Sequence, residues 1–539
     1  MVFEKQPEGN SSLNSNYSAS QEKLYQRLSI ALFVVLSAVV LLTFRDYGVS
    51  WDEQLQSGMG ENVLRFFTSH FHDKTALDMG DLNNYGGLFE VMGAIAARVL
   101  PLGLYESRHL LIAVCGVLGI SAVWKIGRLL AGPGAAFWAA TLLALYPPYY
   151  GHMFINSKDI PFAAFYAWSV YYLMRLLREL PNVGWKTAAK FAVASGLTMA
   201  VRVGGLIVVC YLVLFTGIWF VYSLFFQRGA IRFNVSFLVR KFGFLAVVAV
   251  AAYAMMLAFW PYGLSKPLVR PFVALRWLSH VTTTVSEWDY IPRHLTFKLP
   301  EIVLLFILVG VCLGLRELLR FRTSGSFPAG LSYLVLVFSA LFPVCYAIYV
   351  GPYLYDEIRH FLFIIPPLIC IAALALNWTL ERLMLTKPVV GRFALAALVV
   401  YLILQVRMMW MLHPYEYTYF NRLIGGIEGA SKNGYEAEYW TTSYKEGVEK
   451  LQRYLLERDG AAFERTRYKI LLGNADWCAT YYFPQNFTRV VEPSEADIYL
   501  SATRYGGDAA HAGTVVVDVQ RFGVPFLVGK MMTGKASVK

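Results

Sequence analysis

Charged residues are scarce in this chain. They make up 16% of its 539 residues, whereas soluble proteins carry about 25%. Hydrophobic residues make up 57%, and the mean hydropathy is +0.47. This composition excludes an ordinary soluble protein and indicates a membrane protein. The net charge of +12 does not indicate a nucleic-acid surface, because the basic residues fall mainly in short loops between apolar segments.

Other features are missing as well. The six cysteines have no paired spacing, so neither a disulfide framework nor a zinc site is expected. The chain has no glycine-rich phosphate loop of the Walker type, so ATP-driven transport by this chain alone is not supported. We find no internal repeat or inverted hydropathy symmetry of the sort that many secondary transporters have.

Long apolar segments are abundant. They lie at about 28–44, 108–131, 134–150, 159–177, 187–203, 205–226, 242–261, 300–320, 330–350, 358–379 and 392–412. Each is long enough to approach a membrane crossing, so about eleven transmembrane helices are expected. An odd number places the two termini on opposite sides.

Alternate loops between these segments are rich in Lys and Arg, which marks them as cytoplasmic. The basic residues are Lys125, Arg128, Arg175, Arg178, Lys186, Arg228, Arg232, Arg240, Lys241, Arg316, Arg320, Arg322, Arg382, Lys387 and Arg392. Residues 1–26 are polar and are expected to form a disordered cytoplasmic leader. The first apolar segment is expected to be retained as an anchor.

The predicted fold class is an α-helical polytopic membrane protein with a small α/β domain outside the membrane. Residues 27–412 form the transmembrane module, whose first outer loop is 45–107. Residues 413–539 form the outer domain. A helix is expected at 444–458, and strands are expected at 469–472, 497–500 and 514–519. We expect one or two amphipathic helices within 85–100.

Trp51, Asp52 and Glu53 directly follow the first apolar segment. This places two carboxylates on the outer side of the membrane boundary. An ordinary solvated loop would also explain them. The cations in other outer turns favour a functional role.

The turn at 146–161 carries four further candidates: His152, Asn156, Lys158 and Asp159. A helix start explains part of this pattern, with an Asn or Ser as cap, Asp159 in the first turn and a proline just inside. It explains Lys158 poorly, because a cation near a helix N-terminus opposes the helix dipole. Lys158 therefore either faces a ligand or has a local structural role.

Arg202 and the pair Arg359–His360 lie at the outer ends of apolar segments, where basic residues are unusual. Arg202 either pairs with a local carboxylate or carbonyl, or faces a polar cavity. Arg359 either forms an ion pair with Asp356 or Glu357, or holds an anionic ligand such as a phosphate. An acidic pair, several cations and apolar walls together suit a substrate with a lipid tail, an anionic head and a group that must lose a proton.

The chain resembles integral-membrane glycosyltransferases of the GT-C type. The resemblance is closest to the dolichyl-phosphate-mannose–protein mannosyltransferase-like group, which includes bacterial lipid-A aminoarabinose transferases. It covers roughly residues 28–450. Its motifs are Trp51-Asp52-Glu53, Asn156-Ser-Lys-Asp-Ile-Pro161, Arg359-His360 before a Pro-Pro span, His413-Pro-Tyr-Glu-Tyr-Thr-Tyr-Phe-Asn421, Gly425-Gly426 and Tyr439-Trp440.

This resemblance implies an inverting transfer of a sugar from a polyprenyl phosphate to a hydroxyl acceptor on the outer face. Asp52 would be the general base or would orient the acceptor, and Glu53 would support it. Lys158, Arg202, Arg359 and His360 would bind the donor phosphate. The acceptor or cavity candidates are Trp51, His152, Asn156, Asp159, His413 and Tyr415. No cofactor beyond the lipid-linked donor is expected; no metal site is assigned, and metal dependence is left open.

Two other functions are considered. A transporter or flippase for polyprenyl-linked glycans would need charged residues distributed through the apolar segments, whereas here they cluster on the outer side. A glycan polymerase or ligase that uses a lipid diphosphate shares the outer cavity and the cations. The tail lacks the sugar-binding repeats of eukaryotic protein mannosyltransferases, so a protein acceptor is not assumed. The expected role of the tail is acceptor recognition or coverage of the active-site cavity. The resemblance favours a bacterial inner membrane, with the N-terminus cytoplasmic and the C-terminus outside. The partners expected are the donor, the acceptor and membrane lipid, with no nucleic acid. The sugar, the acceptor and the oligomeric state are left open.

Overall fold

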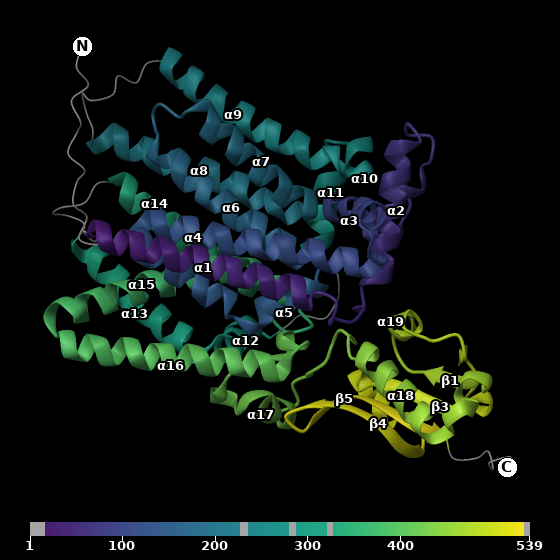
Figure 1. Ribbon diagram of the computed structural model, residues 1–539. Helices are drawn as coiled ribbons and strands as arrows, with labels where there is room; N and C mark the ends of the chain where they lie inside the picture. Colours follow the sequence, from purple (N-terminus) through teal and green to yellow (C-terminus); the bar gives the residue numbers. More distant parts are fainter. Residues whose placement is uncertain (1–16, 227–234, 280–286, 321–326, 533–539) are drawn as a thin grey trace.

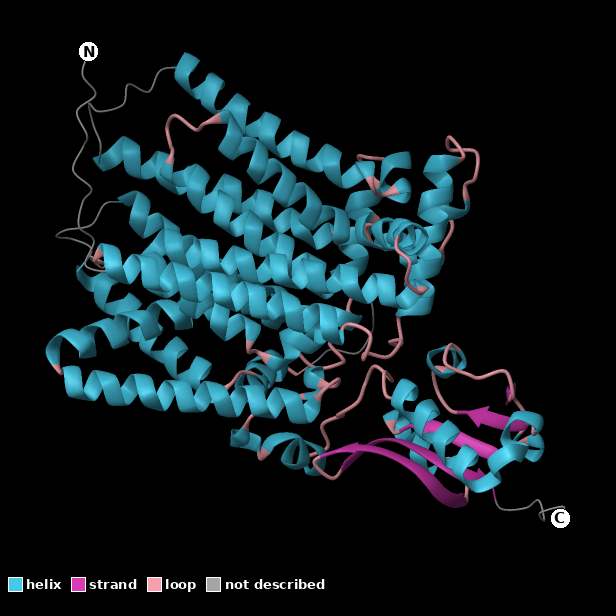
Figure 2. Cartoon of the chain, in the orientation of Figure 1, coloured by secondary structure: helices cyan, strands magenta, loops and turns pink. Residues whose placement is uncertain are grey.

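The computed structural model describes residues 17–226, 235–279, 287–320 and 327–532. A bundle of long helices forms most of the molecule, and a small α/β domain lies against one end of it (Figure 1). The described strands all belong to this domain (Figure 2).

Over the described residues, ten long helices build the bundle: α1 (Ala19–Thr43), α4 (Leu104–Ala144), α6 (Asp159–Arg178), α7 (Trp185–Val201), α8 (Ile207–Phe226), α9 (Val235–Ala258), α13 (Glu301–Arg320), α14 (Phe327–Val350), α15 (Ile365–Thr386) and α16 (Pro388–Leu412). Shorter helices lie mainly at the end of the bundle near the C-terminal domain: α2 (Glu53–Thr68), α3 (Leu88–Val99), α5 (Pro147–Ile155), α10 (Pro261–Ser265), α11 (Arg270–Ser279), α12 (Tyr290–Lys298) and α17 (Gly426–Lys432). The helix α3 confirms the helix expected within 85–100.

Within the described residues, seven helices are long and apolar enough to cross a membrane, or eight if the bent pair α12–α13 is one span. The protein is thus a multi-pass membrane protein, but the expected count of eleven is not confirmed. The difference lies in three segments. The helix α6 is not among these seven, α7 has only 17 residues, and the two segments on either side of residue 131 are counted together as α4.

The long helix α4 is two helical arms joined by a sharp turn. Ala131 and Gly132 leave the helical conformation, and Gly132 has φ of 85°, which favours glycine. Gly127 before the turn lies against the backbone of Ala135 and Ala136 after it, so the arms pack side by side. The two apolar segments expected at 108–131 and 134–150 therefore form a tight hairpin.

The leader is more ordered than predicted. Residues 1–16 lie outside the described residues, but α1 already begins at Ala19, so the prediction of disorder to residue 26 is wrong for its last part. Ser18 caps the helix, and its hydroxyl accepts from the Gln21 N–H while the Gln21 side chain accepts from the Ser18 N–H. The polar composition of this stretch concealed a helix start.

The C-terminal domain holds a five-stranded sheet of order β2-β1-β3-β5-β4. Its strands are β1 (Tyr468–Leu472), β2 (Phe487–Val490), β3 (Ile498–Ala502), β4 (Gly513–Arg521) and β5 (Val524–Met532). Strands β1, β2 and β3 run parallel, and β5 is antiparallel to both β3 and β4. The helices α18 (Tyr444–Asp459) and α19 (Asp476–Thr480) complete the domain. The predicted helix and three predicted strands are confirmed.

Hydrogen bonds attach this domain and the segment leading into it to the first outer loop. The Trp477 indole donates to the Trp51 carbonyl at 3.1 Å, and the Trp51 N–H donates to the Trp440 carbonyl at 3.0 Å. The Val49 N–H donates to the Tyr482 hydroxyl at 3.0 Å. The segment that carries Asp52 is therefore held between the helix bundle and the C-terminal domain.

Candidate active site

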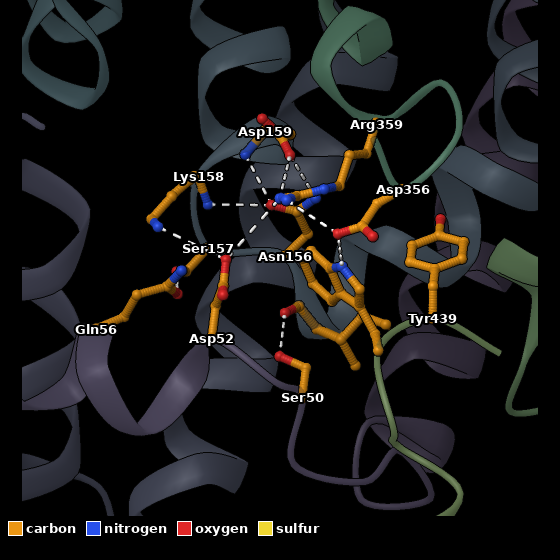
Figure 3. Close-up of polar contacts among 12 residues, drawn as sticks. Ser50, Asp52, Gln56, Asn156, Ser157, Lys158, Asp159, Asp356, Arg359 and Tyr439 are labelled. Atoms are coloured by element: carbon orange, nitrogen blue, oxygen red, sulfur yellow. Dashed lines mark hydrogen bonds and ion pairs between the residues drawn. The ribbon is translucent and has the colours of Figure 1, made fainter. Parts of the chain in front are cut away.

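Asp52 precedes α2 and makes no capping hydrogen bond to it. Its side chain is 28% exposed and faces two cations (Figure 3). The Lys158 Nζ lies 3.6 Å from its Oδ2, and the Arg359 Nη1 lies 3.8 Å from the same oxygen. Asp52 is thus a partly accessible carboxylate in a positively charged surrounding.

The turn between α5 and α6 positions Lys158. The Asn156 Oδ1 accepts from the backbone N–H groups of Lys158 at 3.2 Å and Asp159 at 2.8 Å. The Asn156 amide also donates to the Asp159 Oδ2 at 2.8 Å. The helix start proposed from the sequence therefore accounts for Asn156. It leaves the Lys158 side chain facing Asp52, with its Nζ 4.5 Å from the centre of the Tyr85 ring.

Arg202 follows directly after the end of α7 and pairs with Asp159 at 2.6 Å. Both side chains are largely buried, with 15% and 4% exposed. The structural alternative for Arg202 is therefore present, and its carboxylate partner is itself one of the candidate residues.

Arg359 begins the short helix η4 (Arg359–Ile364) and is buried. Its Nη2 lies 3.0 Å from the Asp356 Oδ2, and its Nη1 lies 3.9 Å from the Asp159 Oδ2. Of the two partners considered from the sequence, Arg359 thus pairs with Asp356, while Glu357 pairs with Lys298. Asp356 and Glu357 have φ of 54° and 60°, an uncommon conformation for residues with a side chain.

The second oxygen of Asp356 binds Arg504, which comes from the C-terminal domain. The Arg504 Nη2 lies 2.6 Å from the Asp356 Oδ1. The cluster thus contains the cations Lys158, Arg202, Arg359 and Arg504 and the carboxylates of Asp52, Asp159 and Asp356. The Arg504 Nε also lies 3.5 Å from the Glu436 Oε1, so cations and carboxylates balance in number. The cation best placed to meet an anionic ligand is Lys158, whose contact with Asp52 is loose.

The pKa of Asp52 follows from this surrounding. Burial alone would raise it, but Lys158, Arg359 and Arg202 outweigh that effect and bring the pKa below its usual value. Asp52 is therefore ionised at neutral pH and can accept a hydrogen bond.

Glu53 points away from this cluster. Its buried Oε2 accepts from the Ser50 N–H at 2.8 Å and lies 3.2 Å from the His109 Nε2. Nearby, the buried Arg108 pairs with Glu90 at 2.5 Å. Glu53 thus fixes the turn that carries Asp52.

The histidine and aromatic candidates fall into two groups. His152 is buried near the cluster, with its Nε2 3.0 Å from the Tyr439 hydroxyl and its Nδ1 3.3 Å from the Asn156 amide. His360 follows Arg359 and lies 4.8 Å from the Tyr355 ring. Trp51 adjoins Asp52 and packs against Trp477.

His413 and Tyr415 lie instead where α16 meets the C-terminal domain. The His413 ring bridges Asp46 at 2.9 Å and Glu416 at 2.8 Å. The Tyr415 hydroxyl donates to Glu446 at 2.9 Å, and Arg521 lies over its ring. Their contacts hold the domain in place and do not reach Asp52.

Sequence reasoning missed Arg504 and gave Asp356 only the role of an ion-pair partner. No local pattern marks Arg504, because it lies in a turn far along the chain. Among the described residues, no group of three or more His, Cys, Asp or Glu side chains is placed to hold a metal ion.

Comparisons with known proteins agree with the resemblance seen in the sequence. Residues 105–253 match the family described as dolichyl-phosphate-mannose-protein mannosyltransferase. The chain matches no curated protein. The resemblance to GT-C glycosyltransferases is thereby confirmed over the matched residues.

Two solved structures are similar to this chain at low sequence identity. The oligosaccharyltransferase AglB from Archaeoglobus fulgidus, in complex with an inhibitory peptide and a dolichol-phosphate, is 12% identical, with a TM-score of 0.51 over 90% of this chain and 70% of that one. ArnT from Cupriavidus metallidurans, bound to undecaprenyl phosphate, is 14% identical, with a TM-score of 0.47 over 93% of this chain and 97% of that one. The likeness to AglB shows that the two chains share a fold.

Proposed function

We propose that the protein transfers a sugar from a polyprenyl-phosphate donor to a hydroxyl acceptor at the outer face of a membrane. The observation that carries the proposal is the position of Asp52. It is a partly exposed carboxylate beside Lys158 and Arg359, which pair with it loosely. A base and an anion-binding group next to one another are what this reaction needs.

Asp52 acts on the acceptor. Its carboxylate accepts the proton of the acceptor hydroxyl as that oxygen bonds to the anomeric carbon of the donor sugar. The bond from the anomeric carbon to the phosphate oxygen breaks, and its electron pair leaves with the lipid phosphate. Attack opposite the leaving phosphate inverts the configuration of the sugar.

Lys158 and Arg359 act on the leaving group. Negative charge grows on the phosphate as the bond breaks, and fixed cations stabilise that charge more in the transition state than before it. Arg202 is paired closely with Asp159, so it helps mainly by positioning that carboxylate. His360 would complete the phosphate site from its place beside Arg359. No cofactor beyond the donor lipid is part of this proposal.

The topology follows from the basic loops. The N-terminus and the Lys- and Arg-rich loops are cytoplasmic, and the first outer loop and the C-terminal domain are outside, which fits a bacterial inner membrane. The start of α1 and the C-terminal domain lie at opposite ends of the bundle, which supports placing them on opposite sides of the membrane (Figure 1). Residues 27–412 would be the catalytic module, and residues 413–539 would recognise the acceptor.

A donor comparison tests the proposal. The purified protein in liposomes is given sugar donors on polyprenyl monophosphate and on polyprenyl diphosphate, with a mixed pool of membrane glycolipid acceptors. Transfer from a monophosphate donor is expected. Transfer only from a diphosphate-linked oligosaccharide would instead establish a ligase, and movement of lipid-linked sugar across the bilayer without transfer would establish a flippase.

A further inference from the structure

One turn of the C-terminal domain, residues 503–507, reaches the charge cluster. Within it, Tyr505 and Gly506 have φ of 57° and 71°. A residue with a side chain rarely adopts this conformation, so the surroundings must hold it. The Gly506 N–H donates to the Thr503 carbonyl at 3.0 Å, and the Asn474 amide donates to the Arg504 carbonyl at 2.7 Å.

Arg504 anchors this turn. Only 6% of the residue is exposed. Its guanidinium binds the Asp356 carboxylate and donates to the Tyr439 carbonyl. It also lies 4.9 Å from the centre of the Trp51 ring. The turn is therefore fixed to the same aspartate that holds Arg359.

Tyr505 is presented to solvent by this fixed turn. It is 75% exposed, although one side of its ring lies 4.7 Å from the Arg504 guanidinium. Its ring centre is 6.2 Å from that of Trp51, which in turn is 5.8 Å from that of Trp477. Three aromatic rings from two parts of the chain thus lie together, and one of them belongs to Trp51, the residue that directly precedes Asp52.

We propose that Tyr505, Trp51 and Trp477 form a subsite for a saccharide ring. A pyranose has an apolar C–H face, which stacks on an aromatic ring, and a rim of hydroxyl groups, which suits the polar surroundings of Asp52. Tyr505 is the contact residue and Arg504 is a positioning residue. The identification of this saccharide as the acceptor rests on the proposed function; the binding itself does not.

Binding can be measured without turnover. The full-length protein in nanodiscs is examined by saturation-transfer NMR with three probes of one length, namely mannotriose, maltotriose and chitotriose, and with a Ser/Thr-rich peptide. At least one trisaccharide is expected to bind. Tyr505→Ala should weaken this binding about three- to tenfold, the usual effect of losing one aromatic contact.

Phe522→Ala is the matched control. Phe522 and Gly523 have φ of 51° and 74°, so their turn has the same backbone geometry, but Phe522 lines a separate hollow with Leu412 and Tyr419. This variant should bind the trisaccharide as the parent does. Arg504→Gln should weaken binding as Tyr505→Ala does, and Arg504→Lys, which keeps a cation beside Asp356, should restore part of it.

The outcomes separate the two proposals. Undecaprenyl phosphate should bind equally to the parent and to Tyr505→Ala, because the Tyr505 ring lies against Arg504 and Trp51 and not against the cations proposed to bind the phosphate, Lys158 and Arg359. Saccharide binding that depends on Tyr505 in a protein without transferase activity would support the subsite and overturn the proposed function. Equal binding by Tyr505→Ala and the parent, no binding of any trisaccharide, or binding of the peptide alone would overturn the subsite.

Discussion

The Lys158 ammonium lies 3.6 Å from the Asp52 carboxylate, whereas Arg202 binds Asp159 at 2.6 Å. A charge-assisted hydrogen bond between such groups is typically about 2.7–2.9 Å long. The contact of Asp52 is therefore loose and that of Asp159 is tight. Lys158 can turn toward an incoming phosphate, while Arg202 remains with its partner. The two cations thus differ in their expected roles.

Replacing Asp52 with Asn removes the base but keeps the shape of the side chain. Glycosyl transfer should fall by about 10²- to 10⁴-fold, the usual contribution of a general base. Binding of undecaprenyl phosphate should persist, because its cations remain. Radiolabelled transfer and lipid binding are measured side by side. Asp78→Asn, a change of an exposed aspartate in the same loop, is the control and should leave both unchanged. Normal turnover by Asp52→Asn would exclude the proposed role.

Replacing Lys158 with Met should weaken binding of undecaprenyl phosphate by about 10- to 100-fold, the value of a hydrogen bond between charged groups. The reason is that Lys158 is bound only loosely within the cluster. Lys158→Arg keeps the charge and should recover part of the affinity. Lys74→Met changes an exposed lysine of the first outer loop and serves as the control. If Lys158→Met bound the lipid as tightly as the parent, the phosphate would lie elsewhere.

Arg202→Leu should destabilise the protein, because it leaves the buried Asp159 carboxylate without its closest partner. The expected cost is about 3–5 kcal/mol, the usual effect of removing one member of a buried pair. Adding Asp159→Asn in the same chain should recover much of it. Thermal unfolding in detergent measures both variants. If the double variant were less stable than Arg202→Leu alone, the pair would not be the source of the loss.

The sequence predicted the features that depend on local patterns. A membrane requires apolar spans and basic cytoplasmic loops, and both are visible in the sequence. The run of valines in β4 predicts a strand. The strand β5 was missed because Pro525 near its start weakens the strand pattern; the pairing of β5 with β3 and β4 overrides that signal.

The candidate site was predictable only in part, because its ion pairs join residues that only the folded chain brings together. The contact of Arg504 with Asp356 joins the C-terminal domain to the segment before α15, and no spacing along the chain encodes it. Glu53 adjoins Asp52 in sequence, yet the start of α2 turns the two side chains apart. His413 and Tyr415 were selected by a motif, which fixes their order in the chain but not their partners.

His413 should stabilise the contact between α1 and α16 most strongly at low pH. Burial alone lowers its pKa, but Glu416 and Asp46 outweigh that effect and raise the pKa above its usual value. A raised pKa in the folded state means that the stabilisation is complete below the unfolded pKa and is lost as the pH rises through the folded one. His413→Gln should thus lower the melting temperature clearly at pH 6 and only slightly at pH 9. Equal losses at both pH values would contradict this role.

The donor phosphate should make Asp52 a stronger base. In the free protein, Lys158 and Arg359 contribute to holding the pKa of Asp52 below its usual value. A bound phosphate would pair with these cations, so their effect on Asp52 would weaken and its pKa would rise. The acidic limb of kcat, which reports the complex, should therefore lie at higher pH than the acidic limb of kcat/KM, which reports the free protein. Lys158→Met should move the acidic limb of kcat/KM to higher pH, toward that of kcat. The reason is that the free variant already lacks one of the cations with which the bound phosphate would pair. If the acidic limbs of kcat and kcat/KM coincided, and Lys158→Met shifted neither of them, the phosphate would not bind beside Asp52.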